Sequence, residues 1–67
     1  MIFGKFIRDE RVMLKMDQRE LSLISGVSLR TIQSIERNEV NPTLSVLELV
    51  IGGLGYELSL KPRISYE

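Results

Sequence analysis

Polar and basic side chains of a few types are concentrated between residues 18 and 37. Arginine can donate two hydrogen bonds to a guanine edge, glutamine can pair with adenine, and leucine or a threonine methyl group can contact the methyl group of thymine. The residues in this stretch that can make such contacts, or bind a nearby phosphate, are Gln18, Arg19, Ser28, Leu29, Arg30, Thr31, Gln33, Ser34 and Arg37. They predict an interface for double-stranded DNA, whereas the alternative interpretation is an ordinary solvated helix face.

Catalytic chemistry has few candidate residues in this chain. The sequence contains no histidine and no cysteine, which removes cysteine nucleophiles and the usual imidazole and thiolate ligands of metal sites. Gly52, Gly53 and Gly55 lie at the end of an expected helix with no helix after them, unlike a phosphate-binding loop. We therefore expect a protein that is not an enzyme and that needs no metal or cofactor.

Two short helices are predicted to hold the polar side chains. Asp17 and Glu20 have the spacing of a capping box at the start of the first helix, and Gly26 is suited to the left-handed turn that ends it. Ser28 can cap a second helix, which runs to residue 37 and stops at Asn38. Two helices joined by a tight glycine turn form a helix-turn-helix motif, here over residues 18–37.

The second of these helices has one apolar and one polar face. At 100° per residue, Ile32 and Ile35 point inward toward the core. The side chains that then cluster on the opposite face are Arg30, Gln33, Ser34 and Arg37. This polar face is the one that we expect to meet DNA.

One further helix is expected on each side of the motif. The inward positions of the first, over residues 3–14, are Phe3, Ile7, Arg11 and Leu14. Those of the last, which follows the turn Asn41-Pro42-Thr43 and ends at Gly55, are Leu44, Leu47 and Ile51. Residues 1–55 are therefore predicted to form one mainly α domain of four helices.

The C-terminal segment, residues 56–67, has a different period. Tyr56, Leu58 and Leu60 alternate with polar residues until Pro62, which predicts a β-strand. Because no other segment resembles a strand, we expect it to pair with the same strand of a second subunit across a two-fold axis. A homodimer would also help a chain of 67 residues, whose core is marginal by itself. The alternative is that this segment is a flexible tail without regular secondary structure.

Charge and hydropathy restrict the interpretation further. Nine basic and nine acidic residues balance, so net charge gives no support to nucleic-acid binding, and a protein-interaction module without DNA binding remains an alternative. The longest apolar stretch, residues 49–54, is too short to span a bilayer. We expect a cytoplasmic protein with no membrane partner.

Several groups of residues resemble one known family. The segments Gln18-Arg19-Glu20-Leu21-Ser22, Ser25-Gly26-Val27-Ser28, Thr31-Ile32, Ile35-Glu36-Arg37-Asn38 and Asn41-Pro42-Thr43 resemble the Cro and phage-repressor (Xre) type of helix-turn-helix. The resemblance covers residues 6–55 and implies a lambda-repressor-like bundle of four or five helices. It also implies a dimeric repressor that docks this helix in successive major grooves of an inverted repeat, with half-sites about 34 Å apart.

Residue roles follow from the same resemblance. The phosphate-contacting glutamine falls on Gln18, and the base-reading positions fall on Leu29, Arg30 and Ser34. Thr31 and Gln33 are secondary candidates for base reading. The family also pairs an arginine of the first helix with the glutamate that ends the recognition helix, which here are Arg11 and Glu36.

The sequence departs from the family pattern in two places. The loop Asn38-Glu39-Val40-Asn41 stands where relatives usually have glycine and then basic residues, and Ser22 stands where alanine is commonest. Glu39 would repel the DNA backbone, so we expect moderate affinity and the release of few counterions.

The C-terminal segment is similar to that of HipB-type antitoxins, since Leu54-Gly55 is followed at once by the alternating residues 56–62. This resemblance implies a repressor of its own operon, dimerised by an intermolecular sheet, with a HipA-type kinase toxin as a second partner. A stand-alone Xre-family regulator without a toxin is the alternative.

Overall fold

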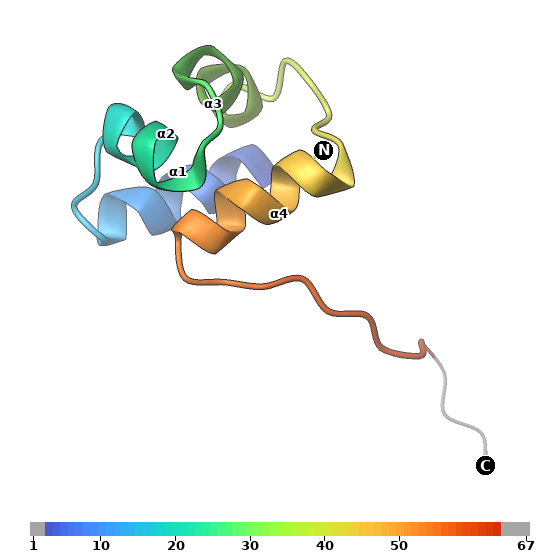
Figure 1. The fold of residues 1–67 in the computed structure, drawn as a ribbon. Helices are drawn as coiled ribbons and strands as arrows, with labels where there is room; N and C mark the ends of the chain where they lie inside the picture. The colour runs from blue at the N-terminus through green and yellow to red at the C-terminus, as the bar shows by residue number, and fades with distance from the viewer. Residues whose placement is uncertain (1–2, 64–67) are drawn as a thin grey trace.

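The computed structural model describes residues 3–63, and four helices lie within them. These are α1 (Phe3–Met13), α2 (Gln18–Ser25), α3 (Leu29–Glu36) and α4 (Leu44–Gly53). In Figure 1, α3 lies on one side of the bundle, and the chain after α4 leaves on the opposite side as an extended arm. The mainly α, four-helix fold is therefore confirmed. None of these helices is long and apolar enough to cross a lipid bilayer.

The start and the end of α2 are set by the predicted signals. The Asp17 side chain accepts a hydrogen bond from the Glu20 amide, and the Glu20 side chain accepts one from the Asp17 amide, both at 2.8 Å. Gly26 ends the helix at φ 77°, a left-handed conformation that glycine adopts without a Cβ clash. Ser22 Oγ then donates to the Val27 carbonyl at 2.7 Å. Ser22, which stands where the family usually has alanine, thus supplies a side-chain hydrogen bond that closes the turn.

Helix α3 begins at a serine cap, as predicted. Ser28 Oγ accepts from the Thr31 amide at 3.1 Å, and Asn38 has φ 60° just beyond the helix. The last helical residue is Glu36, one residue earlier than the predicted end. Arg37 is the C-cap, whose amide still bonds to the carbonyl of Gln33.

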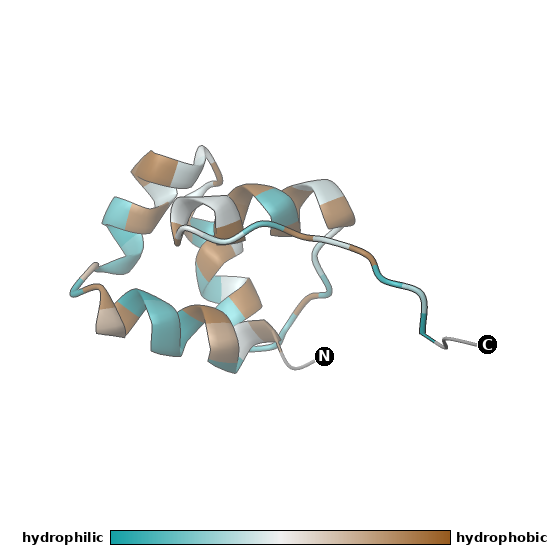
Figure 2. Ribbon diagram, turned by 90° about the horizontal axis from the view of Figure 1, so that it is seen from below, coloured by the Kyte–Doolittle hydropathy of each residue, from teal (hydrophilic) through white to brown (hydrophobic). Residues whose placement is uncertain are grey.

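The core forms where all four helices meet. It consists of Ile7, Leu21, Val27, Ile32, Ile35, Leu47, Val50, Ile51 and Leu54. Figure 2 shows brown apolar stretches alternating with teal ones along the helices, as one-sided burial requires. The inward positions predicted at Leu14 and Leu44 are wrong, since these side chains are 52% and 71% exposed. Leu14 follows the end of α1, and Leu44 is the first residue of α4, so neither lies under a neighbouring helix.

A glycine lets α1 approach the end of α3. A Cβ atom on Gly4 would lie 2.5 Å from the Ile35 carbonyl oxygen and 2.9 Å from that of Glu36, distances that real Cβ atoms do not adopt. Only glycine therefore permits this close contact between the two helices. The contact sets the position of α3 relative to α1.

The expected C-terminal strand is absent from residues 56–63 of this single chain, so the structure does not support that prediction. A strand needs a partner edge, and the elements that the structure describes are all helices. Tyr56 instead packs on α1: its hydroxyl donates to Glu10 Oε1 at 2.8 Å, and its ring meets Phe6 edge-on at 5.2 Å between centroids. Beyond it, Leu60 is 99% exposed.

Candidate nucleic-acid interface

The outward face of α3 carries the polar side chains named above. Ile32 and Ile35 are 0% and 1% exposed and hold the helix to the core. On the other side, Arg30 is exposed, while Leu29, Thr31, Gln33 and Ser34 are half-buried. Arg37 is exposed just past the helix end. The face that can enter a groove is thus polar and partly supported by its neighbours.

Helix α3 is tied to the rest of the bundle through a partly buried ion pair. Arg11 Nε lies 2.8 Å from Glu36 Oε2, and a second guanidinium nitrogen of Arg11 lies 2.9 Å from Glu36 Oε1. Arg11 also donates to the Met16 carbonyl at 2.9 Å. One guanidinium therefore joins α1, the loop before α2 and the end of α3 in a fixed geometry.

Burial makes this pair energetically demanding. The side chains of Arg11 and Glu36 are 12% and 4% exposed, so both charges have left most of their water. The hydrogen bond from Arg11 to Glu36 raises the pKa of the arginine, while burial acts in the opposite direction. The arginine stays charged, and its positive charge balances the negative charge at the end of α3.

Gln18, the first residue of α2, reaches the same cluster. Its Nε2 donates to Glu36 Oε1 at 3.1 Å, and its Oε1 accepts from Gln33 Nε2 at 3.5 Å. The amide thus lies at the junction of α2 and α3, beside the free backbone N–H groups of the α2 N-terminus. Such groups attract anions, so this junction can bind a phosphate.

Two candidate contact residues have a structural task as well. The hydroxyl groups of Ser28 and Thr31 lie 2.9 Å apart and bond to each other, and Ser28 caps α3.

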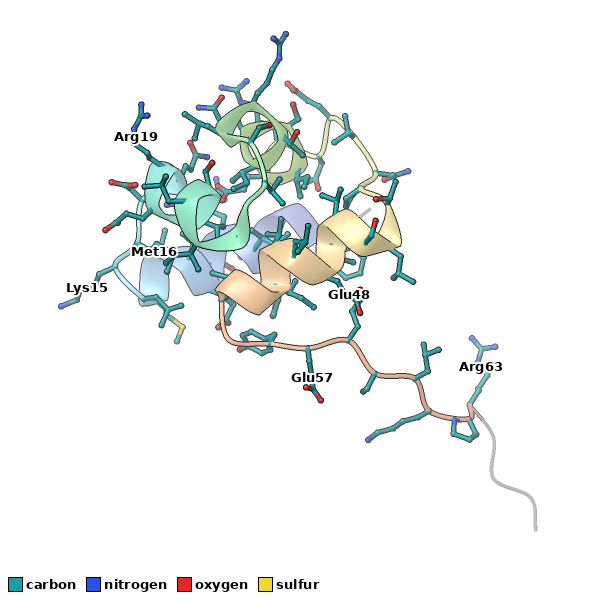
Figure 3. The ribbon with its side chains drawn as sticks, viewed as in Figure 1. Lys15, Met16, Arg19, Glu48, Glu57 and Arg63 are labelled. Atoms are coloured by element: carbon teal, nitrogen blue, oxygen red, sulfur yellow. The ribbon has the colours of Figure 1, made fainter. Side chains whose placement is uncertain are left out.

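Arg19, Arg30 and Arg37 have no ion-pair partner among residues 3–63 and remain exposed. Figure 3 shows Arg19 projecting outward from α2. The free positive charge of this side of the molecule comes from these three arginines.

A family model described as helix-turn-helix matches residues 7–61. The chain belongs to the helix-turn-helix family. The type is the Cro and phage-repressor (Xre) type that the motifs indicated, and the motif predicted at residues 18–37 corresponds to α2, the glycine turn and α3.

Two relatives share this part of the chain. The immunity repressor protein of Bacillus phage phi105 is 42% identical over 55 residues, which are 82% of this chain and 36% of the phage protein. A protein of Methanococcus maripaludis named as an HTH-type transcriptional regulatory protein is 44% identical over 45 residues, 67% of this chain and 14% of its own length. The match therefore spans little more than a third of the phage repressor and about a seventh of the Methanococcus maripaludis protein. No solved structure gives a significant match.

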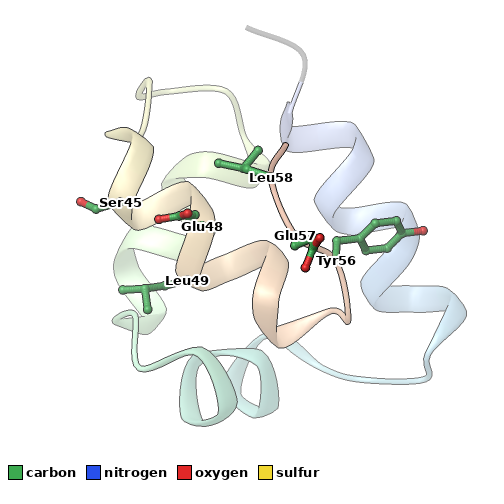
Figure 4. A pocket seen from close by; sticks show the side chains of 6 residues that line it. All are labelled: Ser45, Glu48, Leu49, Tyr56, Glu57 and Leu58. Atoms are coloured by element: carbon green, nitrogen blue, oxygen red, sulfur yellow. The ribbon is translucent and has the colours of Figure 1, made fainter. Parts of the chain in front are cut away.

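The C-terminal residues that were expected to form the dimer interface lie outside the helix-turn-helix site. The arm that follows α4 leaves the bundle on the side opposite α3 (Figure 1), and Tyr56, Leu58 and Leu60 line grooves there with residues of α4. There, Ser45, Glu48, Leu49, Tyr56, Glu57 and Leu58 line an open groove of about 630 Å³, drawn in Figure 4. A second groove of about 350 Å³ is lined by Leu44, Glu48, Leu58, Ser59 and Leu60.

Sequence reasoning missed some residues that build the helix-turn-helix site. Gly4 carries no motif and looks like any helical glycine, so only the close approach of α3 reveals its importance. The Met16 carbonyl is a backbone group that no side-chain pattern could indicate.

Glu39, whose charge was expected to oppose DNA, is exposed in the loop after α3. Among residues 3–63, no three carboxylates converge as they would around a metal ion.

Proposed function

We propose that this chain is a sequence-specific DNA-binding transcriptional repressor that acts in the cytoplasm by binding and not by catalysis. The observation that carries the proposal is the polar outer face of α3, which is anchored from behind by Ile32, Ile35 and the Arg11–Glu36 pair. The relative named as a phage immunity repressor supports the same function. A neutral chain can bind DNA in this way because the charge that matters is local.

The recognition side offers the exposed arginines Arg19, Arg30 and Arg37 to a polyanion, with the exposed Glu39 as an opposing charge in the loop after α3. Glu36 is paired with Arg11, and Glu20 is bonded to the Asp17 amide in the capping box. Within residues 3–63, Arg19 of α2 and Arg30 of α3 face solvent without an acidic partner. In the proposed complex, Arg30 reads guanine from the major groove while Gln18 and Arg19 bind backbone phosphates. Leu29 and Ser34 complete the base contacts, with Thr31 as a further candidate.

We further propose that the repressor is a homodimer joined through the arm that follows α4. Within residues 3–63, the arm has an exposed Leu60 and no strand to pair with, and a second copy supplies both an apolar cover and an edge. Antiparallel pairing centred on Ser59 would place Glu57 opposite Lys61 of the second copy and Leu58 opposite its Leu60. Opposite charges and apolar pairs at facing positions stabilise such a ladder.

The regulated operon is proposed to be the protein's own, in the manner of a HipB-type antitoxin with a HipA-type kinase toxin as partner. The feature that favours a protein partner is the pair of grooves beside α4, which lie away from α3 and contain Leu44, Leu49 and two glutamates. Such a surface stays open when α3 is in a DNA groove. The competing proposals are a stand-alone Xre-family regulator and a protein-interaction module without DNA binding.

The test is binding to the DNA fragment upstream of the protein's own gene, compared with a scrambled fragment at physiological salt. We expect tighter binding to the first fragment. Arg30→Ala should lower the discrimination at the one base pair that Arg30 contacts by about 10- to 100-fold. Gln18→Ala is the matched variant, since loss of a phosphate contact weakens binding to both fragments alike. Equal affinity of the wild-type protein for both fragments would favour the interaction module.

A further inference from the structure

The amide group of Gln18 has only one possible orientation in the structure. Both Glu36 oxygens are engaged by Arg11, and a carboxylate paired in this way can only accept hydrogen bonds. Gln18 must therefore turn its Nε2 toward Glu36, at 3.1 Å, which leaves its Oε1 facing α3. The group found there is Gln33 Nε2, at 3.5 Å.

We propose that Gln33 is a positioning residue for the phosphate contact of Gln18 and not a reader of bases. This inference rests on the proposed DNA-binding function. An amide nitrogen carries two N–H groups, and in this arrangement Gln18 and Gln33 each use one of them. The N–H group that remains on Gln18 can donate to a phosphate oxygen, which only accepts.

The relay Arg11–Glu36–Gln18–Gln33 connects the ion pair to the DNA-facing surface. Each bond orients the next side chain: the arginine holds the glutamate, the glutamate orients the Gln18 amide, and Gln33 holds that amide from the other side. Gln33 is half-buried against α2, whereas Arg30 on the same face of α3 is exposed. Base reading is thereby left to Arg30 and its neighbours Leu29 and Ser34.

The contact can be detected without DNA in the full chain. The sequence has two glutamines and two asparagines, so its nuclear magnetic resonance spectrum contains only four side-chain amide pairs. Gln33→Ala should remove one pair and shift the Gln18 pair, because Gln18 loses a bonding partner. Asn41→Ala is the matched control, which removes a different pair and should leave Gln18 unmoved. An unchanged Gln18 pair in Gln33→Ala would overturn the relay.

The role in binding is tested with two duplexes, the fragment upstream of the gene and a mixed-sequence duplex of equal length. Gln33→Ala should weaken binding to both by the same factor, about three- to tenfold, as expected for one supporting hydrogen bond. In a Gln18→Ala background the same change should cost less than about twofold, because the group that it positions is gone.

Other outcomes decide against specific parts of the inference. A loss confined to one duplex would make Gln33 a base reader, and additive losses in the double variant would show that it acts independently of Gln18. Either result overturns the inference while the proposed function stands. If the wild-type protein binds neither duplex, the proposed function itself fails, and the amide spectrum still decides whether the relay exists.

Discussion

At the scale of single residues, the hydrogen-bond partners of Glu36 decide whether its burial is tolerated. Glu36 is 4% exposed and has three hydrogen bonds from side chains of α1 and α2. Taking such a carboxylate out of water costs several kcal/mol, which only its partners offset. The pair therefore contributes orientation to α3 more than net stability, and its value becomes visible when one member is removed.

Replacement of Arg11 by methionine tests this dependence. Arg11→Met should lower the free energy of unfolding by about 3–5 kcal/mol, because the Glu36 charge is left buried without its main partner. Urea denaturation followed by circular dichroism measures the change. The double variant Arg11→Met/Glu36→Leu is the control and should recover most of the loss, since no buried charge remains. A single variant as stable as the wild-type protein would mean that Glu36 reaches water easily.

At the scale of elements, the helices meet at contacts that tolerate little change. The most restrictive is the approach of α1 to the end of α3 at Gly4, where two backbone carbonyl oxygens would lie within 3 Å of an added Cβ. Backbone atoms cannot move aside in the way that the end of a flexible side chain can. The position of the recognition helix thus depends on the absence of a single methyl group.

A pair of glycine substitutions measures this constraint. Gly4→Ala should destabilise the protein by about 1–3 kcal/mol, because α1 must move away from α3. Gly52→Ala is the matched control in α4, where an added Cβ meets nothing within 4 Å. That variant should gain roughly 0.5–1 kcal/mol from the higher helix propensity of alanine. Thermal unfolding of both variants would show the difference, and equal stability would argue against a tight contact at Gly4.

The start of the arm is also held to α1 by one tyrosine. The hydrogen bond from Tyr56 to Glu10 raises the pKa of the tyrosine above its ordinary value, because ionisation would place two negative charges together. A raised pKa in the folded state means that the contact stabilises at neutral pH and is lost as the pH rises through that pKa. The arm should therefore separate from α1 only in alkaline solution, above about pH 10.

The pKa of Tyr56 can be measured by its ultraviolet absorbance in a Tyr66→Phe background, which leaves one tyrosine. Glu10→Gln should lower this pKa toward the ordinary value, because the carboxylate charge is removed. Glu48→Gln, which changes a glutamate that makes no contribution to the pKa shift of Tyr56, is the control. If Glu10→Gln left the titration unchanged, the anchor of the arm would lie elsewhere.

At the scale of the whole molecule, the polar face of the recognition helix and the C-terminal arm lie on opposite sides of the bundle. The polar face of α3 lies on one side, and the arm and its grooves lie on the other. The molecule extends 47 Å in its longest direction and 23 and 19 Å in the others, so the arm projects well beyond the helices. A projecting arm can reach a second copy without covering the DNA-facing surface.

A single cysteine tests the proposed pairing of the arms. The chain has no cysteine of its own, so Ser59→Cys introduces the only thiol. If the two-fold axis passes at Ser59, the Cα atoms of facing residues lie about 4.5–5.5 Å apart, within reach of a disulfide. Mild oxidation should then give a covalent dimer. Glu57→Cys is the control, because its two copies would be separated by more than about 10 Å along the strands.

Charge exchange provides an independent check of the same register. Glu57→Lys and Lys61→Glu should each weaken the dimer in sedimentation experiments, because like charges would then face each other. The double variant restores opposite charges and should restore the dimer. Equal cross-linking of both cysteine variants, or a dimer unaffected by the single charge changes, would contradict pairing centred on Ser59.

Local interactions determined how much of this protein was predictable from its sequence. The capping box at Asp17, the glycine turn at Gly26 and the Ser28 cap involve residues within a few positions of each other, so their patterns predict helix ends directly. The inward faces at Ile7, Ile32 and Ile35 follow from helical period in the same way. The Arg11–Glu36 contact is long-range and was indicated only by resemblance to the family.

Tertiary structure decided what depends on segments far apart in the chain. Leu14 and Leu44 continue an apolar period but lie beyond the reach of neighbouring helices, so period alone predicts burial that packing does not provide. The alternation of residues 56–62 predicts a strand, yet a strand exists only where another edge accepts its hydrogen bonds, and the helices of one chain offer none. The sequence by itself determined where helices begin, end and turn, because those signals act within a few residues. Which surfaces meet, at Gly4, at Tyr56 and in the relay through Gln18, was decided by the folded chain, because such contacts depend on distances that only packing sets.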